Sequence, residues 1–581
     1  MNTNSFDEIF RELTGNLPFP WQRALFERFA AGDIPASCNL PTGLGKTNVI
    51  AIWLIALGKH PEKMPRRLVY VVNRRTVVDQ TTTEAEKLRA NAAKADVPVP
   101  VISTLRGQFA DNREWSTDPS KPAIICGTVD MIGSRLLFSG YGVGRNSKPL
   151  HAGFLGQDVL LVHDEAHLEP AFQELLIAIE NEQSRCVDFG KFRVMELTAT
   201  PRVGTEPFRL TKEEREPPAA IPSEATEPIH HVWRRTQAMK ALVPHPITDE
   251  KKELVTKLVD LALRYQDQDA KPAVLLFMRT VEAVGEVVNG LKKGKVPEEN
   301  ILTLTGTMRG LERDLMTEKN RVFARFKKES TVAPQTGTVF LVCTSAGEVG
   351  VDMSADHLVC DLSTFDSMAQ RFGRVNRYGD GDATIDFVHP TTFETNDSRY
   401  EPARERTLGF LDELRRRSDG VLDACPSAMS ELVERVLRVG TEAELTPMDR
   451  SEAIRKYLLP AFAPTPTILP TSDILFDAWA LTTIKGQLPG RPEVESYLHG
   501  IEEEASFDTE FAWREEVALL TGKVGEDEIV GLMEEFPLRP HEVLRVPTFS
   551  KIGAYTQLEE IAARQPDLPA WVIEPNGQLT V

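Results

Sequence analysis

The segment Pro41-Thr42-Gly43-Leu44-Gly45-Lys46-Thr47 constrains the fold of this chain more than any other feature. It lies between a short strand-like run, SCNL, and an apolar helical run, NVIAIWLIALG. A glycine-rich turn that opens a helix directs backbone N–H groups and the helix dipole at phosphate groups. The segment therefore predicts a phosphate-binding loop (P-loop) in an α/β domain.

Two side chains give this loop its expected chemistry. Lys46 would reach the β- and γ-phosphates of ATP, and the Thr47 hydroxyl would bind Mg²⁺. The strict GxxxxGK[ST] pattern is not met, because Leu40 stands in the place of its first glycine. The other residues of the loop that we expect to bind ATP are Thr42, Gly43 and Gly45.

Strand-like runs alternate with helical patterns twice along the chain. The first set is SCNL, RLVYVV, PVIST, AIICG, DVLLVHDE and RVMELTAT, and the second is AVLLF, ILTLT, TVFLVCT, HLVCDLS and TIDFVH. Buried strands interleaved with helices predict parallel, doubly wound sheets. We therefore expect an α/β protein with two such domains, over residues 1–210 and 236–400. A Pro- and Glu-rich linker over 211–235 would join them, and a mainly helical accessory region would occupy 401–581.

Acidic residues are concentrated near the C-terminal end. The formal net charge is −19, and residues 441–581 carry 25 Asp and Glu against 11 Lys and Arg. This region is therefore not expected to be the main phosphate-binding surface, although local basic grooves elsewhere can still bind nucleic acid. Its tryptophans, Trp479, Trp513 and Trp571, are either core residues or a platform on which bases stack.

Cysteine usage and hydropathy predict a cytoplasmic protein. The six cysteines form no CxxC pair, which favours free thiols in a reducing compartment. The N-terminus, MNTNSFDEIFRE, lacks the basic and apolar regions of a signal peptide. The longest strongly apolar stretch, Val49 to Leu57, is too short to span a bilayer. We expect no membrane association and take a monomer as the default.

The segment Asp164-Glu165-Ala166-His167 follows the apolar strand candidate DVLLVH. Carboxylates at the C-terminal end of a strand in an α/β sheet point into the ligand crevice. ATP hydrolysis needs one carboxylate to hold Mg²⁺ and another to orient and deprotonate the attacking water. We expect Asp164 to hold the metal and Glu165 to act as the base.

The segment Gln370-Arg371-Phe372-Gly373-Arg374-Val375-Asn376-Arg377 lies late in the second α/β half. Its arginines recur every three residues and would line one face of a helix, as a solvated basic face also would. A hydrolytic site between two domains needs a guanidinium that reaches the developing γ-phosphate charge from the facing domain. We expect Arg374 and Arg377 to be these arginine fingers, with Gln370 beside them.

With these three segments, residues from about 15 to 390 resemble superfamily 2 DEAH-type helicases, which hydrolyse ATP between two RecA-like domains. The resemblance implies that Gln22, in Phe19-Pro20-Trp21-Gln22, contacts the adenine base. It places Asp352 at the ATP cleft. It also implies that Thr198 and Thr200, in Thr198-Ala199-Thr200, couple hydrolysis to strand movement.

Further motifs in the order of that family imply contacts with the nucleic-acid backbone. They are Asn73-Arg74-Arg75-Thr76, Gly127-Thr128-Val129-Asp130, Phe277-Met278-Arg279-Thr280, Leu304-Thr305-Gly306 and Thr344-Ser345-Ala346-Gly347-Glu348-Val349-Gly350-Val351-Asp352. The strand contacts implied by the resemblance are Arg74, Thr128, Arg279, Thr305 and Thr344.

A narrower resemblance is to the helicase of type I CRISPR interference, in particular subtype I-G, formerly I-U. It rests on GTVDMIGSRLLFSGYG, LHAGFLGQDVLLVHDEAHLEPAFQ, Leu105-Arg106-Gly107-Gln108 and QRFGRVNRYG. This resemblance implies recruitment to target DNA by a guide-RNA surveillance complex. It also implies loading on the displaced single-stranded DNA and 3′-to-5′ translocation.

The chain departs from that family in one respect. The family's helicase is usually fused to an HD-type metal nuclease, yet only His499 and His541 lie beyond residue 440. The dipeptide His163-Asp164 lies inside the DEAH strand, and we interpret it as coincidence. The nuclease is then a separate polypeptide, a missing part of a longer protein, or unnecessary. Two alternatives stay open: an RNA helicase or restriction-system translocase, and an adaptor with an inactive motor.

Overall fold

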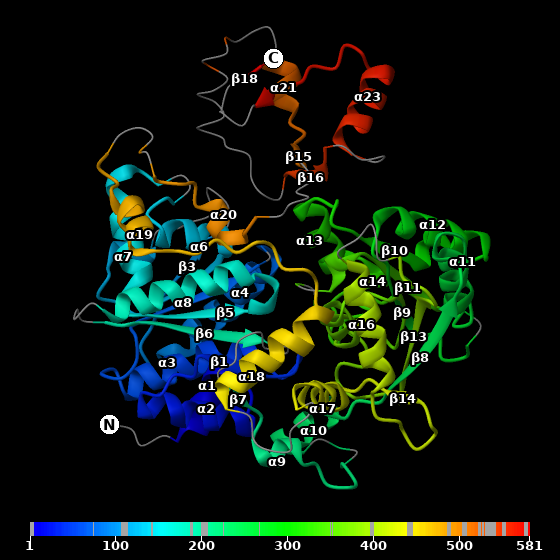
Figure 1. The fold of residues 1–581 in the computed structure, drawn as a ribbon, viewed down its shortest axis with the longest axis horizontal. Helices are drawn as coiled ribbons and strands as arrows, with labels where there is room; N and C mark the ends of the chain where they lie inside the picture. Colours follow the sequence, from blue (N-terminus) through cyan, green and yellow to red (C-terminus); the bar gives the residue numbers. More distant parts are fainter. Residues whose placement is uncertain are drawn as a thin grey trace.

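The structure is a computed structural model of the 581-residue chain. It describes residues 5–73, 75–105, 114–140, 143–185, 190–198, 207–222, 224, 226–266, 268–348, 350, 352–394, 400–438, 446–484, 488, 490–501, 508–520, 525, 528, 542–548, 553–573 and 579–580. Two large α/β units lie side by side, and a smaller C-terminal element lies above their junction (Figure 1).

The first unit is built on a parallel sheet of 7 strands in the order β3-β4-β2-β5-β6-β1-β7. The strands are β1 (Ser37–Asn39), β2 (Arg67–Val72), β3 (Val101–Leu105), β4 (Ala123–Thr128), β5 (Val159–Asp164), β6 (Phe192–Thr198) and β7 (Phe208–Arg209). One face is covered by α1 (Phe6–Thr14), α2 (Pro20–Ala31), α3 (Val49–Lys59) and α4 (Arg75–Ala92). The other face is covered by α6 (Val129–Leu136), α7 (Lys148–Gly156) and α8 (Pro170–Ser184), while the short α5 (Glu114–Thr117) follows β3.

The second sheet repeats the topology of the first. Its order is β10-β11-β9-β12-β13-β8-β14, which is the same order counted from its own first strand. The strands are β8 (Lys240–Ile247), β9 (Ala273–Phe277), β10 (Ile301–Leu304), β11 (Val339–Cys343), β12 (His357–Asp361), β13 (Ala383–Pro390) and β14 (Leu422–Asp423). Of these, β14 alone is antiparallel to its neighbour. All the strand runs expected from the sequence are present, so the prediction of two doubly wound domains is confirmed.

Strand β8 is the long strand that the sequence pattern did not predict. It contains Pro244 and Pro246, and proline cannot donate a hydrogen bond to a neighbouring strand. One edge of β8 pairs with all of β13, whereas β14 pairs on the other edge only at Leu242 and Ala241. The two prolines lie beyond that short pairing. A strand that carries them is therefore stable at this position in the sheet.

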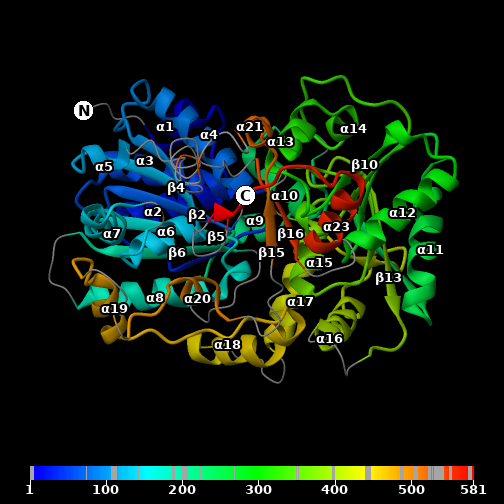
Figure 2. The same ribbon diagram turned by 90° about the horizontal axis from the view of Figure 1, so that it is seen from above.

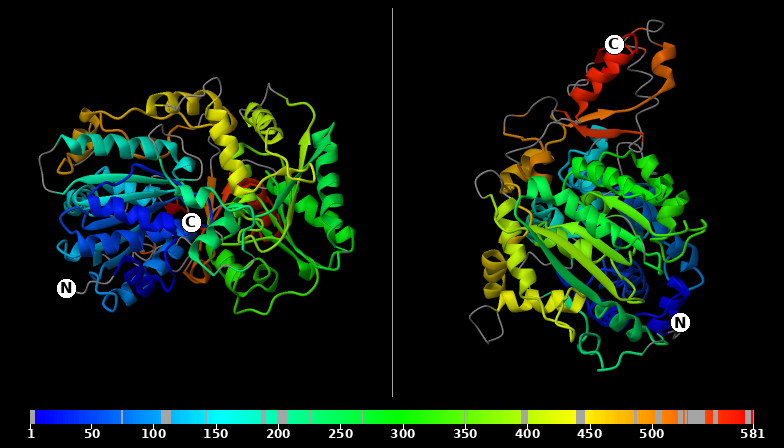
Figure 3. Two further views of the ribbon diagram at one scale, coloured as in Figure 1. Left: turned by 90° about the horizontal axis from the view of Figure 1, so that it is seen from below. Right: turned by 90° about the vertical axis from the view of Figure 1, so that its right-hand side faces the viewer.

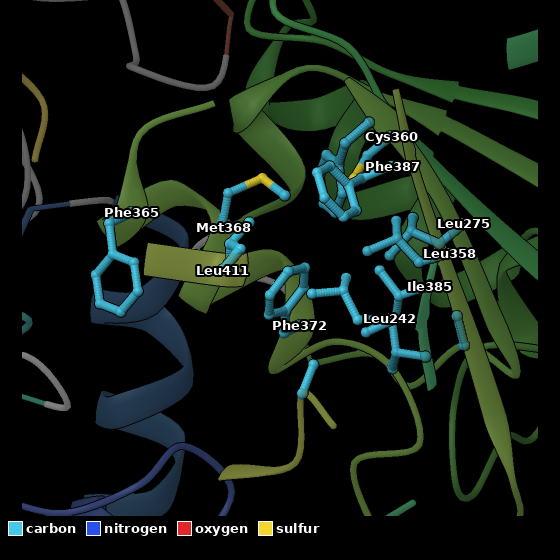
Figure 4. Packing of buried hydrophobic residues seen from close by; sticks show 14 of the residues in the cluster. Leu242, Leu275, Leu358, Cys360, Phe365, Met368, Phe372, Ile385, Phe387 and Leu411 are labelled. Carbon is cyan, nitrogen blue, oxygen red and sulfur yellow. The ribbon is translucent and has the colours of Figure 1, made fainter. Parts of the chain in front are cut away.

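Helices cover both faces of the second sheet. One face carries α11 (Glu250–Leu263) and α12 (Val281–Lys293). The other is associated with α13 (Gly310–Lys319), α14 (Arg321–Ala324), α15 (Phe365–Phe372), α16 (Tyr400–Asp412) and α17 (Pro426–Leu437). Figure 4 shows Phe372 of α15 directed at Leu242 and Met368 directed toward the side where Phe387 and Cys360 lie. This packing fixes the arginine-rich segment that follows α15.

The chain beyond residue 400 is not one separate unit. Strand β14 and helices α16 and α17 complete the core of the second sheet. After α18 (Pro447–Ala453), the chain returns to the first unit (Figure 2), where α19 (Asp473–Ala480) and α20 (Glu495–His499) pack beside α6 and α8. Trp479 is 1% exposed in that core. Of the two predictions for this tryptophan, a core residue or a platform on which bases stack, the structure supports the core residue. The sequence predicts a domain boundary at residue 401, where the pattern becomes helical. The helices directly after that residue nevertheless pack in the core of the second sheet.

The remaining C-terminal segments project above both units (Figure 3). Strands β15 (Asp508–Phe511) and β16 (Leu544–Pro547) pair antiparallel, and α23 (Ala554–Arg564) lies beyond β16 in the sequence. The other elements are α21 (Glu515–Leu520), β17 (Val572–Ile573) and β18 (Leu579–Thr580). The expected linker contains two helices, α9 (Lys212–Arg215) and α10 (Pro228–Thr236). No helix in the described part of the chain is long and apolar enough to cross a membrane.

Candidate active site

The phosphate-binding loop follows β1 and leads into α3, as the sequence predicts. Gly43 and Gly45 adopt φ angles of 82° and 73°, which other residues adopt only with strain. A short 3₁₀ turn, Lys46–Asn48, then joins directly to α3. The loop therefore has the backbone that lets amide groups at a helix N-terminus surround a phosphate.

Lys46 and Glu165 form a buried ion pair at the centre of the site. Lys46 Nζ lies 3.0 Å from Glu165 Oε1, and the two side chains are 9% and 16% exposed. Burial raises the pKa of Glu165, but Lys46, His167 and Arg374 together outweigh burial and lower this pKa to about 2. Burial lowers the pKa of Lys46, but Glu165 raises it overall. Both groups are therefore charged, and each holds the other when no phosphate is bound.

Asp164 ends β5 beside this pair. Its Oδ2 accepts a hydrogen bond of 2.8 Å from the Tyr70 hydroxyl. Burial, together with the neighbouring Glu165 carboxylate, raises the pKa of Asp164 to about 6, although Lys46 opposes the shift. The Asp164 carboxylate, held in this way, and the Thr47 hydroxyl on the adjacent turn are both hard oxygen donors. Mg²⁺ prefers donors of this kind.

Glu165 has a backbone conformation that is uncommon for its residue type. Its φ of 51° is left-handed, which costs about 1–3 kcal/mol for a side chain other than glycine. Strain of this kind persists where surrounding contacts hold the residue in place. Here Gln370 of α15 supplies one such contact, because its Nε2 donates to Glu165 Oε2 at 3.2 Å. The second unit thus reaches the proposed base directly.

The arginine segment does not form the helix face that its spacing predicts. Helix α15 ends at Phe372, and Gly373 is its C-cap. A Cβ atom at Gly373 would lie 2.7 Å from Thr42 Oγ1, so the end of α15 lies against the loop of the first unit. Arg371 is 1% exposed and pairs inside the second unit with Glu348 at 2.7 Å. It is therefore a structural residue. The prediction of three arginines on one helix face is wrong, because the helix stops before the second of them.

Arg374 and Arg377 lie beyond the helix and near the first unit. A side chain at Gly43 would lie 3.2 Å from Arg377 Nε, and Arg377 Nη1 donates to Asp352 Oδ1 at 2.8 Å. Arg374 donates to the carbonyl oxygen of Glu348 and contributes to lowering the pKa of Glu165. The structure thus brings these two arginines, Asp352 and Gln370 to the P-loop and the DEAH segment.

Gln22 lies buried beside the loop. Its Oε1 accepts a hydrogen bond of 2.8 Å from the Phe19 amide. Its Nε2 has no hydrogen-bond partner among the residues that the structure describes, and it lies 3.5 Å from where a side chain on Gly45 would begin. A buried amide donor without an acceptor costs about 1–3 kcal/mol. An acceptor on a bound base would satisfy it, so the site fits a nucleotide.

The predicted coupling motif contacts the DEAH segment. Thr198 ends β6, and its hydroxyl lies 3.2 Å from Nδ1 of His167. His167 Nε2 lies 3.4 Å from Gln370 Nε2 of the second unit. A continuous set of contacts therefore joins the end of β6 to α15. Thr200 and Arg74, which the sequence also singles out, lie outside the described residues.

The residues expected to contact the nucleic-acid backbone instead contact other parts of the protein in this structure. Thr128 and Thr344 cap the turns that follow them, accepting from Met131 and Ala346 amides. Thr305 Oγ1 lies 3.0 Å from Thr307 Oγ1. Arg279 pairs with Glu250 at 2.7 Å and Asp361 at 3.2 Å, so it is not free to meet a phosphate unless these contacts change. Their role in strand binding stays a prediction.

The sequence pattern did not predict the contacts that His499 makes. Its Nε2 lies 2.7 Å from Asp130 Oδ1, and its Nδ1 lies 3.3 Å from Glu169 Oε2. Hydrogen bonds to Asp130 and Glu169 raise the pKa of His499 to about 10. Glu169 also accepts from Asn73 Nδ2 at 2.6 Å. Helix α20 is thus fastened to two segments for which strand contacts are predicted.

His163 and Asp164 are adjacent in sequence, but their side chains lie in different surroundings. Successive residues of a strand point to opposite faces of the sheet. His163 is fully buried, and its Nδ1 lies 2.8 Å from Gln173 Oε1. Burial lowers the pKa of His163 to about 4. The HD dipeptide therefore does not present both side chains to one metal ion.

Two family models match separate parts of the chain. One, described as "Type III restriction enzyme, res subunit", matches residues 18–203. The other, described as "CRISPR-associated nuclease/helicase Cas3, C-terminal", matches residues 270–380. The first match covers the P-loop and DEAH segments, and the second covers the arginine segment. No curated protein matches the chain.

Solved structures of T. fusca Cas3 are similar to this chain. The match to the structure with AMPPNP has a TM-score of 0.52 and 16% sequence identity, and it covers 78% of this chain and 55% of the Cas3 chain. The match to the structure with ADP has a TM-score of 0.52 and 18% sequence identity, and it covers 78% of this chain and 56% of the Cas3 chain. The chain therefore spans little more than half the length of these relatives. What the likeness establishes is the fold: tandem RecA-like domains with a helical region.

Proposed function

We propose that this protein is an ATP-driven translocase and helicase on single-stranded DNA. The observation that carries the proposal is the composite site at the junction of the two units. Lys46, Asp164 and Glu165 come from the first unit, and Gln370 reaches Glu165 from the second at 3.2 Å. Hydrolysis then requires both domains, so cycles of closure and release can move a strand.

The Lys46–Glu165 pair suggests how hydrolysis depends on nucleotide. Without ATP, the Lys46 ammonium and the Gln370 amide both hold the Glu165 carboxylate. When phosphates occupy the loop, they compete for Lys46, and Glu165 is then free to orient and deprotonate water. Arg374 and Arg377 would stabilise the charge that develops on the γ-phosphate.

Mg²⁺ fits the same place. Asp164 and the Thr47 hydroxyl would hold the ion, which neutralises charge on the β- and γ-phosphates when it is bound. Burial raises the pKa of Asp164, and the charge of Lys46 opposes that rise and favours the ionised carboxylate. Tyr70 keeps that carboxylate in place through its hydroxyl.

The substrate and partners of the proposal rest on the family resemblance. The match of residues 270–380 to a Cas3 C-terminal model supports a role in type I CRISPR interference. There the motor would move 3′-to-5′ after recruitment by a guide-RNA surveillance complex. An HD-type nuclease, on a separate polypeptide or on a further part of the same protein, would cut the strand. The match of residues 18–203 to a restriction-enzyme subunit favours a second candidate, a restriction-system DNA translocase.

A strand-separation assay tests the proposal. Partial duplexes with a 3′ or a 5′ single-stranded tail, of DNA or of RNA, are incubated with the protein, ATP and Mg²⁺, and Lys46→Ala is the control. We expect ATP-dependent separation of the DNA duplex with a 3′ tail and an intact labelled strand. Separation only of RNA, or only from a 5′ tail, would contradict the substrate or the direction. Translocation along intact duplex without strand separation would support the restriction-system candidate.

A further inference from the structure

A cavity of about 850 Å³ lies between the two units. Its walls come from the start of the P-loop, from β7 and the segment after it, and from α15 and α17. Helices α9 and α17 lie at the junction of the units, on the side opposite strands β15 and β16 (Figure 1). Among the described residues, the lining does not include Lys46, Glu165 or Gln22. Cavities that hold small organic ligands measure about 300–1,000 Å³, so this one has room for such a ligand beside the candidate active site.

Much of the wall is apolar. It includes Leu210 of the first unit and Phe365, Phe372, Met429 and Val433 of the second. Burial of apolar surface against these side chains is favourable, so a ligand that fits this part of the cavity has an apolar body.

Arginines gather at one end of the wall. Glu434 Oε1 lies 2.9 Å from Arg209 Nη2 and 2.6 Å from Arg450 Nη2, so two guanidinium groups share one carboxylate. Burial lowers the pKa of Arg209, and the charges of Arg450 and Arg215 lower it further, although Glu434 opposes the shift. The Arg209 side chain lines the cavity and is 27% exposed, so a ligand can reach it.

Most carboxylates of the wall already have donors within the protein. Glu431 pairs with Arg415 at 2.7 Å. Glu214 accepts hydrogen bonds from two backbone amides, and Asp366 accepts one. Glu216 is exposed, and solvent screens its charge.

Several cations of the wall, in contrast, have no carboxylate partner in the part of the chain that the structure describes. Lys240 is 1% exposed, and its Nζ donates to the carbonyl oxygen of Phe372 at 2.7 Å. Arg435 and Arg438 lie three residues apart on α17 and its C-cap, and both line the cavity. An anionic group on a ligand would supply the partner that the protein does not.

We propose that this cavity binds a small organic anion, with the anionic group beside Arg209 and an apolar body against Phe365 and Met429. Thr42 of the P-loop and Gln370 of α15 also line the cavity. Because the walls belong to both units, the ligand binds most tightly at one arrangement of the units. Its binding is then linked to that of ATP, and each ligand changes the affinity of the other by the same factor. This linkage rests on the proposed function, whereas binding of the anion does not.

The fluorescent anion anilinonaphthalene sulfonate tests the proposal. Phenylnaphthylamine, which has the same rings without the sulfonate, is its neutral control. Each probe is titrated into the full chain, and its emission, which rises in apolar surroundings, reports binding. We expect the anion to bind saturably, with one molecule per chain, and more tightly than the neutral probe.

Arg209→Met removes the cation, while Glu434 keeps Arg450 as its partner. We expect this variant to weaken binding of the anion about tenfold to a hundredfold, the range of a hydrogen bond to a charged group, with binding of the neutral probe unchanged. Arg193→Met is the matched control, because Arg193 of β6 pairs with Glu180 and does not line the cavity. It should leave both affinities unchanged.

A second variant tests the cavity itself. Ser430 is exposed on α17 and lines the cavity, so Ser430→Trp should occupy part of the space and weaken binding of both probes, whereas Ser430→Ala should not. This variant keeps the test decisive if Arg209→Met folds poorly.

Unchanged binding of the anion in both Arg209→Met and Ser430→Trp would overturn the inference. Equal loss of both probes in Arg209→Met would overturn the anionic class of the ligand, because Arg209 would then only shape the cavity. As ADP is added, affinity for the anion should approach a limiting value, and an affinity that falls without limit would place the probe in the nucleotide site and overturn the inference. A chain that binds the anion as expected but does not bind ATP would refute the proposed function and the linkage, and would still support the anion site.

Discussion

Replacing Glu165 by glutamine should separate nucleotide binding from hydrolysis. The substitution removes the proposed base but keeps its size, and we expect turnover to fall about 10²- to 10⁴-fold. ATP binding, in contrast, should become tighter. Lys46 now shares a charged hydrogen bond of 3.0 Å with Glu165, and it must give up part of that bond to reach a phosphate.

The size of the binding effect follows from that contact. A hydrogen bond between charged groups contributes about 1.5–3 kcal/mol, and a neutral one contributes about 0.5–1.5 kcal/mol. Both side chains of the pair are mostly buried, so solvent screens the difference little. In the glutamine variant the side chain at position 165 therefore holds Lys46 less strongly, by about 1–1.5 kcal/mol. ATP competes with a weaker contact and should bind roughly fivefold to tenfold more tightly.

The assay pairs calorimetric binding of ATP with steady-state turnover. Glu196→Gln is a matched control, because it makes the same chemical change at a buried carboxylate on the neighbouring strand β6. The control should retain wild-type turnover. Wild-type turnover in Glu165→Gln would refute its assignment as the base, and weaker ATP binding would refute the reasoning about Lys46.

Three further predictions follow from the same contacts. Lys46→Ala should weaken ATP binding about a hundredfold, measured by calorimetry, and intact binding would remove Lys46 from the phosphate site. Burial raises the pKa of Glu196 from 4.5 to about 7, so the folded state holds this proton more tightly and stability falls as pH rises through that window. In urea titrations Glu196→Gln should therefore gain up to about 3 kcal/mol on the wild type between pH 4.5 and pH 8; a constant difference would contradict this. His499→Ala breaks the contact of α20 with Asp130 and should weaken single-stranded DNA binding about tenfold in an anisotropy assay while sparing ATP affinity; equal strand affinity would exclude a role for α20.

Much of the fold could be predicted because its strands are buried on both faces. The centres of runs such as DVLLVHDE and TVFLVCT are continuously apolar, and the P-loop signal fixes where one strand ends and a helix begins. Strand β8 escaped prediction because Pro244 and Pro246 break the pattern that a central strand would need. The repeated strand order of the two sheets is likewise invisible in sequence, because different residues build the same topology.

The candidate site was predictable only where local sequence carries the chemistry. Lys46 and Glu165 belong to short motifs with fixed spacing. His499, which contacts the segment of Asp130, belongs to no such motif, because 369 residues separate it from this partner. The packing of the helices beyond residue 400 escaped prediction for a related reason. A Cβ atom on Gly133 of α6 would lie 2.3 Å from Leu498 Cδ2 of α20, so a larger residue there would force Leu498 to move, and no local sequence pattern predicts such packing.

The central claim is that a nucleic-acid strand stimulates ATP hydrolysis at a site shared by the two RecA-like domains. The most direct test is ATP turnover by the purified chain with no nucleic acid, with single-stranded DNA and with single-stranded RNA. The account predicts turnover that rises strongly with single-stranded DNA and depends on Arg377, which lies against Gly43 across the domain junction. Turnover that is absent, or that rises only with RNA, would contradict it.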